Sequence, residues 1–100
     1  MPCFILSADG ERTALASAPR DLDEACSALN CSGIEFVSGV DQFEGTPAQM
    51  IVDEDHARKK LPLNTAAVAI RDTAYASRGL SSADPIFGAV LILTGSDRLR

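Results

Sequence analysis

The sequence has few of the residues from which catalytic, metal-binding and base-stacking sites are built. It contains no tryptophan, one tyrosine, four phenylalanines and one histidine among 100 residues. So few aromatic side chains provide no stacking platform for single-stranded nucleic acid. The longest apolar run, residues 86–93, falls short of the roughly 20 residues that cross a bilayer. The N-terminal residues lack the basic region of a signal peptide, so we predict a cytoplasmic protein without a membrane partner.

Cysteine is scarce as well, and its spacing is poor for a metal site or a disulfide framework. Cys3, Cys26 and Cys31 are an odd number without dense spacing. We expect free thiols, with a Cys26–Cys31 disulfide as the less favoured alternative. A zinc site drawn from Cys26, Cys31 and His56 would lack the close ligand pairs of structural zinc. Since no glycine-rich phosphate loop and no G-x-S-x-G motif occur either, the sequence predicts no cofactor, metal or catalytic residue.

The charge is negative overall and unevenly distributed along the chain. The net charge is −5, with eleven acidic and two basic residues in positions 1–55, against three acidic and seven basic residues in positions 56–100. A chain that binds nucleic acid directly usually has a basic balance, so we do not expect that activity. An acidic surface can instead steer association with a basic protein surface.

The first third of the chain predicts a hairpin followed by a helix. Residues 3–7 and 12–16 are short β-prone segments on either side of Asp9-Gly10, a strong hairpin signal. Asp21 is a helix cap, with Glu24 at capping-box spacing. From there, apolar positions repeat along one helical face at Leu22, Ala25, Cys26 and Leu29.

Three further strands and a second helix follow. Residues 34–38 and 49–53 predict antiparallel neighbours, and residues 86–93 are apolar on both faces, which indicates a strand covered on both sides or buried mid-sheet. Residues 53–60 read as an exposed charged turn. Residues 65–78 predict a helix capped by Asn64 and ended by Gly79, although a short strand is an alternative for part of it.

These elements predict one α+β domain over residues 1–100, in the order β-β-α-β-β-α-β. The sheet is expected to be mostly antiparallel, with both helices on one face. Residues 96–100 are expected to be a frayed tail. The predicted core consists of Phe4, Leu6, Leu22, Leu29, Ile34, Phe36, Met50, Val52, Val68, Ile70, Phe87, Leu91 and Leu93.

Residues 51–64 (IVDEDHARKKLPLN) and 84–95 (DPIFGAVLILTG) resemble a family of small uncharacterised bacterial, phage and plasmid proteins, known only as a domain of unknown function. The resemblance covers Ile51 to Gly95. It implies an α+β fold and a gene on mobile DNA, and it implies no catalytic residue. By analogy with other small acidic proteins of mobile elements, it suggests an inhibitor of a host nucleic-acid-binding defence complex.

Three functions remain open from the sequence. The leading hypothesis is a non-enzymatic binding protein whose partner is a host protein or protein complex. The second is a small enzyme or metal-dependent accessory protein centred on His56, which follows three acidic residues. The third is a structural homodimer that uses a sheet edge. For the leading hypothesis, the candidate partner-binding residues are Asp21, Asp23, Glu24, Glu35, Asp41, Phe43 and Glu44.

Overall fold

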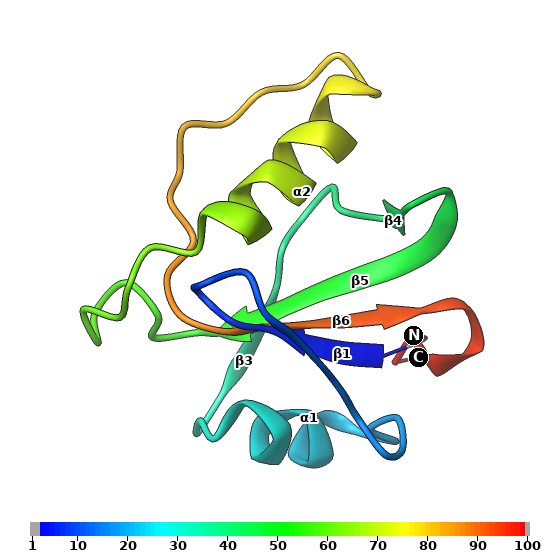
Figure 1. Ribbon diagram of the computed structural model, residues 1–100, viewed down its shortest axis with the longest axis vertical. Coiled ribbons are helices and arrows are strands. Elements are labelled where there is room, and N and C mark those ends of the chain that lie inside the picture. Colours follow the sequence, from blue (N-terminus) through cyan, green and yellow to red (C-terminus); the bar gives the residue numbers. More distant parts are fainter. Residues whose placement is uncertain (1–2, 100) are drawn as a thin grey trace.

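The computed structural model describes residues 3–99, which form an antiparallel sheet between two helices (Figure 1). The strands are β1 (Cys3–Leu6), β2 (Arg12–Ala14), β3 (Ile34–Phe36), β4 (Gln42–Phe43), β5 (Thr46–Asp53) and β6 (Val90–Thr94). The helices are α1 (Leu22–Leu29), α2 (Thr65–Ala76) and the short 3-10 helix η1 (Gly95–Asp97). The predicted α+β class is confirmed. No helix within residues 3–99 has the length and apolarity needed to span a membrane.

The sheet has the strand order β2-β1-β6-β5-β3, and every pair of neighbours is antiparallel. The predicted β1–β2 hairpin and the predicted pairing of β3 with β5 are both confirmed. One element departs from the predicted order, because the two-residue strand β4 precedes β5 and pairs with it alone. The strand predicted to be the most buried, β6, lies in the middle of the sheet.

The prediction that both helices cover one face is wrong, since α1 and α2 lie on opposite faces (Figure 1). Along β6, Val90 and Ile92 belong to the apolar layer under α2, whereas Leu91 and Leu93 belong to the layer over α1. β5 alternates in the same way. Strands that are apolar at every position must be covered on both faces, and one helix covers only one.

The two apolar layers differ in size. The larger one lies between the sheet and α2, and the smaller one lies between the sheet and α1. The buried residues of the larger layer are Phe4, Leu6, Val40, Met50, Val52, Ala67, Ala74, Ile86, Val90 and Ile92. Those of the smaller layer are Cys3, Ala25, Ile51, Leu91 and Leu93.

Of the thirteen predicted core residues, six are buried, five are half-buried and two are exposed. Leu22 is 55% exposed and Phe36 is 43% exposed. Both lie at the margin of the α1 layer, because Leu22 begins α1 and Phe36 belongs to the edge strand β3. An eight-residue helix is only about 12 Å long, so α1 leaves the edge of this face uncovered.

Asn64 joins three parts of the fold and is fully buried. Its side-chain oxygen accepts a hydrogen bond from the Ala67 N–H at 2.9 Å and so caps α2, as predicted. Its side-chain nitrogen donates to the carbonyls of Leu6, 3.1 Å away at the end of β1, and of Gly88, 2.8 Å away before β6. One amide therefore fixes where α2 begins relative to two strands.

The segment before β6 is not a strand, although the sequence predicts one from residue 86. Gly88 has a φ of +76° and donates its N–H to the Pro62 carbonyl at 2.7 Å. A Cβ at this position would lie 2.7 Å from Leu61 Cδ1. This close approach at Gly88 delays β6 until Val90.

α2 ends at Ala76, earlier than the predicted end at residue 78, but the predicted helix-ending residue Gly79 is left-handed, with a φ of +71°. Gly79 donates its N–H to the Ala76 carbonyl, and Leu80 donates to the Tyr75 carbonyl. These two hydrogen bonds form a Schellman motif with Gly79 at the left-handed position.

The predicted frayed tail is instead attached to the sheet over its described part, residues 96–99. The side chain of Gln49 donates to the Leu99 carbonyl at 2.8 Å and accepts from the Leu99 N–H at 2.7 Å. Leu99 also packs against the layer over α1. The side chain of Gln49, in the middle of β5, thus makes the hydrogen bonds to Leu99 that the backbone of a neighbouring strand would otherwise make.

Replacing Asn64 with alanine should destabilise the fold by about 3 kcal/mol, because one cap is lost and two buried carbonyls lose their donor. Asp21→Ala is the matched control. It removes the cap of α1, in which Asp21 Oδ1 accepts the Glu24 N–H at 2.9 Å, and should cost about 1 kcal/mol because that cap is exposed to water. Urea unfolding of both variants measures the difference. Equal losses would show that the buried side-chain donor of Asn64 contributes nothing.

Candidate functional site

The seven candidate partner-binding residues do not form one surface. Three of them, Asp21, Asp23 and Glu24, are at the start of α1 on one face of the sheet. Phe43 packs against the apolar layer on the opposite face, and Glu44 follows it in the turn after β4. The remaining two are Glu35, in the edge strand β3, and Asp41, just before β4.

The acidic group at the start of α1 is already engaged in local interactions. Asp21 caps the helix, and Glu24 accepts hydrogen bonds from both the backbone and the guanidinium of Arg20. The side-chain hydrogen bond from Arg20 lowers the pKa of Glu24, and the backbone hydrogen bond of Arg20 acts in the same direction. The carboxylates of Asp21 and Glu24 therefore support the helix entrance, whereas Asp23 takes no part in these hydrogen bonds.

The turn between β4 and β5 consists of Glu44 and Gly45, and both have positive φ, at 51° and 80°. This is the conformation of a two-residue type I′ hairpin, which favours Asn-Gly. Glutamate is unusual there, because a Cβ in the left-handed region crowds the following carbonyl. Glu44 is thus held in a strained conformation with its side chain 69% exposed and 3.7 Å from the guanidinium of Arg12.

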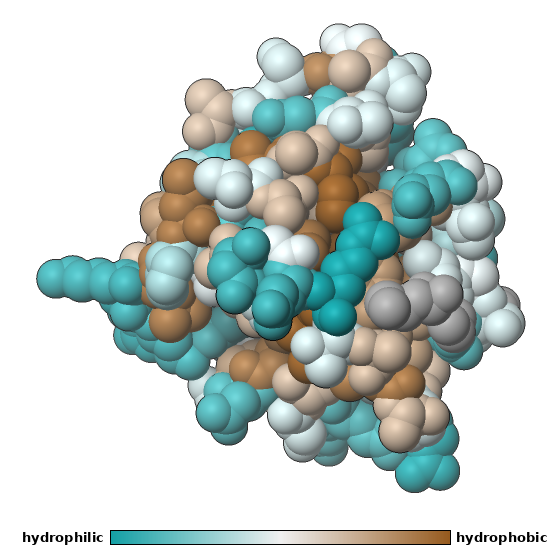
Figure 2. All heavy atoms as spheres, viewed as in Figure 1, coloured by the Kyte–Doolittle hydropathy of each residue, from teal (hydrophilic) through white to brown (hydrophobic). Residues whose placement is uncertain are grey.

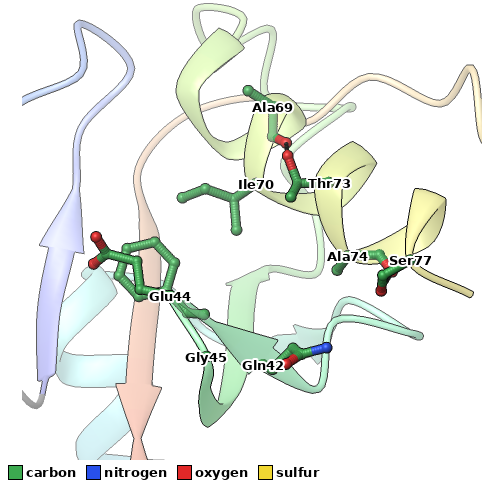
Figure 3. A pocket seen from close by; sticks show the side chains of 9 residues that line it. Gln42, Glu44, Gly45, Ala69, Ile70, Thr73, Ala74 and Ser77 are labelled. Carbon is green, nitrogen blue, oxygen red and sulfur yellow. Dashed lines mark hydrogen bonds between the residues drawn. The ribbon is translucent and has the colours of Figure 1, made fainter.

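A groove of about 470 Å³ runs between this turn and α2 (Figure 3). On one side, Gln42, Phe43, Glu44 and Gly45 line it from β4 and the turn. The α2 side is formed by Ala69, Ile70, Thr73, Ala74 and Ser77. Most of these helix residues are small, so they leave space that larger side chains would fill. The volume falls within the range of ligand-binding pockets.

The walls of the groove are mainly apolar. The Thr73 hydroxyl donates to the Ala69 carbonyl at 2.9 Å and the Ser77 hydroxyl donates to the Ala74 carbonyl at 2.7 Å, so both point back to their own helix (Figure 3). Phe43 packs against the core and contacts Phe4, with the ring centroids 5.6 Å apart and the rings tilted by 55°. Figure 2 shows apolar surface below α2, bordered by hydrophilic residues.

The sequence analysis identified Phe43 and Glu44 but missed the helix wall. Its signal is nevertheless present, because Ala69, Thr73 and Ser77 recur every four residues on one side of α2 and are all exposed. A helix that carries small residues in a row leaves a shallow groove against whatever faces it. The pattern was missed because only the fold shows that β4 lies opposite this row.

His56, the centre of the enzyme hypothesis, borders a second cavity of about 660 Å³. Its Nδ1 accepts the Phe87 N–H at 3.1 Å, and its ring lies 5.9 Å from the Phe87 ring. Glu35 and Ser38 also line this cavity, but within residues 3–99 no hydrogen bond joins either of them to His56. The imidazole is therefore used to hold the segment that leads into β6.

Arg71 also borders this second cavity, although its side chain is only 4% exposed. It donates to the carbonyls of Ser82 and Asp84 and forms an ion pair with Asp72 at 3.1 Å. Its guanidinium lies 5.8 Å from the Tyr75 ring. With its donors occupied in this way, Arg71 fixes the linker after α2 and does not act as a free anion-binding group.

The residues weighed for a zinc site are only partly brought together. Cys26 and Cys31 are neighbours at the end of α1, while His56 uses its Nδ1 for Phe87. In the part of the chain from residue 3 to residue 99, no group of three or more metal-ligating side chains converges.

The charged turn after β5 contains an ion pair whose carboxylate is largely buried. Asp53, whose side chain is 11% exposed, contacts the Lys59 ammonium at 2.5 Å and accepts the Asp55 N–H at 2.9 Å. Burial acts to raise the pKa of Asp53, but the hydrogen bonds from Lys59 and Asp55, with the Lys59 charge, outweigh it and lower the pKa. The same hydrogen bond raises the pKa of Lys59.

Stability should therefore fall as the pH drops through the lowered pKa of Asp53, since the unfolded chain then binds the proton more tightly. Lys59→Met should be less stable than the wild type at neutral pH. The difference should begin to shrink below about pH 4, where the carboxyl of the unfolded chain takes up a proton, and should be lost as the pH falls through the lowered pKa of Asp53 in the folded protein. Urea titrations of both proteins between pH 3 and pH 7 measure this, with Lys60→Met as the control. A difference that stays constant with pH would contradict the pairing.

Comparison with family models, with curated proteins and with solved structures finds no match to this chain.

Proposed function

We propose that this protein is a non-enzymatic binding protein that receives an apolar side chain of a partner protein in the groove between α2 and the β4–β5 turn. A basic residue beside that side chain would meet Glu44 at the rim. The observation that carries the proposal is an apolar groove with a strained, exposed carboxylate at its edge. Apolar anchors in desolvated pockets, surrounded by polar rims, provide most of the affinity of protein interfaces.

The strain at Glu44 supports a role in binding rather than in folding. A left-handed non-glycine residue costs roughly 1–2 kcal/mol, and Asn-Gly would form the same turn without that cost. The exposed ion pair with Arg12 offsets little of this cost, because exposed ion pairs contribute at most about 1 kcal/mol to stability. Unfavourable backbone conformations that persist in a fold are concentrated at functional sites. The carboxylate is thus retained where a more stable residue was available.

The negative charge of this protein favours a partner with a basic surface. The protein carries a net charge of −5. Asp41 directly precedes Gln42, which lines the groove. The Asp41 side chain is 67% exposed and lies 3.8 Å from the guanidinium of Arg78. A partner surface with lysine or arginine around an apolar anchor would be steered to this region and would compete with the weak pairs of Arg12 and Arg78. A basic host protein, such as a nucleic-acid-binding defence complex, has this character, and the resemblance to proteins of phages and plasmids supports the same choice.

The two other hypotheses are less well supported. The enzyme hypothesis needs His56 as a base, but its Nδ1 is occupied by the Phe87 N–H. A homodimer would use an edge of the sheet, where the strands β2 and β3 have only three residues each. Edges this short offer few unpaired backbone groups to a second copy.

Filling the groove should abolish binding while preserving the fold. Thr73→Arg places a long side chain in the groove from an exposed helix position, where arginine is a good helix former. Ala76→Arg is the matched control, since it adds the same charge to an exposed position of α2 that does not line the groove. The measurement is capture from a host lysate with each immobilised protein. We expect proteins retained by the wild type and by Ala76→Arg to be lost with Thr73→Arg. Identical sets, or none, would overturn the proposal.

Glu44→Asn should separate stability from binding. Asparagine tolerates the left-handed turn, so the variant should be more stable than the wild type by about 1 kcal/mol. Association with the captured partner should become slower and less dependent on salt. Asp23→Asn, which removes a carboxylate on the opposite face, should leave association unchanged. Chemical unfolding and binding kinetics at two salt concentrations test this. Faster binding, or an equal effect of both variants, would show that Glu44 is not at the interface.

A further inference from the structure

The end of α1 brings two of the three cysteines together through its backbone. Asn30 has a φ of +54° and follows the last residue of the helix. The Asn30 N–H donates to the Ser27 carbonyl at 3.1 Å, and the Cys31 N–H donates to the Cys26 carbonyl at 3.0 Å. This pair of hydrogen bonds defines a Schellman motif, in which the residue after the left-handed position folds back over the last turn.

Cys26 and Cys31 occupy the two positions of this motif whose side chains meet. In most proteins these positions hold apolar residues that contact each other. Here both are thiols, and both are half-buried and within reach of solvent. Burial raises the pKa of Cys31, and the charge of Asp53 and the neighbouring Cys26 thiol act in the same direction. The Cys31 thiol donates to the Gly33 carbonyl at 3.2 Å.

We propose that Cys26 and Cys31 are a site of reversible disulfide formation, which reacts with low-molecular-weight disulfides such as oxidised glutathione. The proposal is independent of the groove and of its partner. A disulfide needs two cysteines with nearby Cα atoms and converging Cβ atoms. The hydrogen bond from the Cys31 N–H to the Cys26 carbonyl holds the two backbones together before any reaction takes place, at positions whose side chains frequently contact each other.

The reaction follows from the different surroundings of the two thiols. The Cys26 thiolate attacks one sulfur of the glutathione disulfide, which gives a mixed disulfide and releases one glutathione thiolate. Cys31, whose pKa is raised by burial, then loses its proton to solvent and attacks the Cys26 sulfur. The second glutathione thiolate leaves, so two electrons pass from the protein to the reagent and two protons to the released thiols.

The third cysteine provides an internal comparison. Cys3 lies in β1 and is 3% exposed, and burial raises its pKa, followed by the charge of Asp97. A buried thiol with a raised pKa reacts slowly with disulfides. Trypsin also separates the sites, because Cys26 and Cys31 share the peptide of residues 21–58 whereas Cys3 precedes Arg12.

The test compares the folded protein with the same protein unfolded in urea. Both are equilibrated with mixtures of reduced and oxidised glutathione, quenched with acid and alkylated. Mass spectrometry then measures the fraction of the 21–58 peptide that has lost two hydrogens. Because the motif holds the thiols together only in the folded state, the equilibrium constant for disulfide formation should be at least about tenfold larger in the folded protein. An equal or smaller constant would overturn the proposal.

Single variants identify the two partners. Cys26→Ser and Cys31→Ser each remove one thiol, so the remaining one should accumulate as a glutathione adduct that the wild type does not retain. Cys3→Ala should form the same disulfide as the wild type. A stable adduct on the wild-type 21–58 peptide would show that the second thiol cannot reach the first, and would also overturn the proposal. The comparison of folded and unfolded wild type requires no variant to fold.

Discussion

The hydrogen bonds of the Asn64 side chain are the constraint on which the rest of the structure depends. A buried amide can offer two donors and accept on its oxygen, and here the donors are aimed at β1 and at the segment before β6 while the oxygen caps α2. The backbone of Asn64 adds a fourth link, because its N–H donates to the Ile86 carbonyl at 2.7 Å. The position of α2 over the sheet is fixed from its first residue. That position also determines how far α2 lies from β4, and therefore whether the groove exists.

The second constraint is the two-sided sheet. Residues 50–52 of β5 and 90–93 of β6 are apolar and buried at successive positions, which obliges the chain to place a helix on each face. In 100 residues this leaves short helices and incomplete coverage. On one face the shortfall exposes Phe36 and Leu22, and on the other it leaves the groove beside the small residues of α2. The groove thus results from covering two faces of the sheet with two short helices. Its rim is formed by a turn that has Glu-Gly where Asn-Gly would be more stable.

Local signals predicted the elements well. The caps Asp21 and Asn64 and the helix-ending Gly79 each follow from a residue type whose conformational preference is strong, and all three are confirmed. The arrangement of the helices was predicted wrongly, because alternation cannot assign faces when both faces of a strand are apolar. The candidate site was found in part for a similar reason. Phe43 and Glu44 stood out in sequence, whereas the opposing wall on α2 depends on β4 lying opposite a row of small residues.

The place of β6 in the chain has a consequence for how the protein folds. β6 is the middle strand of the sheet, yet among the described strands it comes last in sequence. Its partner β1 begins at Cys3, and Cys3 pairs with Leu93. The two halves of the sheet, β1 with β2 and β3 with β5, can form earlier, but nothing joins them until β6 arrives. Contacts between residues so far apart in sequence slow folding. On the ribosome, the chain would carry two unpaired strand edges, of β1 and β5, until β6 has been made. During that time, chaperones or rapid synthesis would be needed to keep these edges from pairing with other chains.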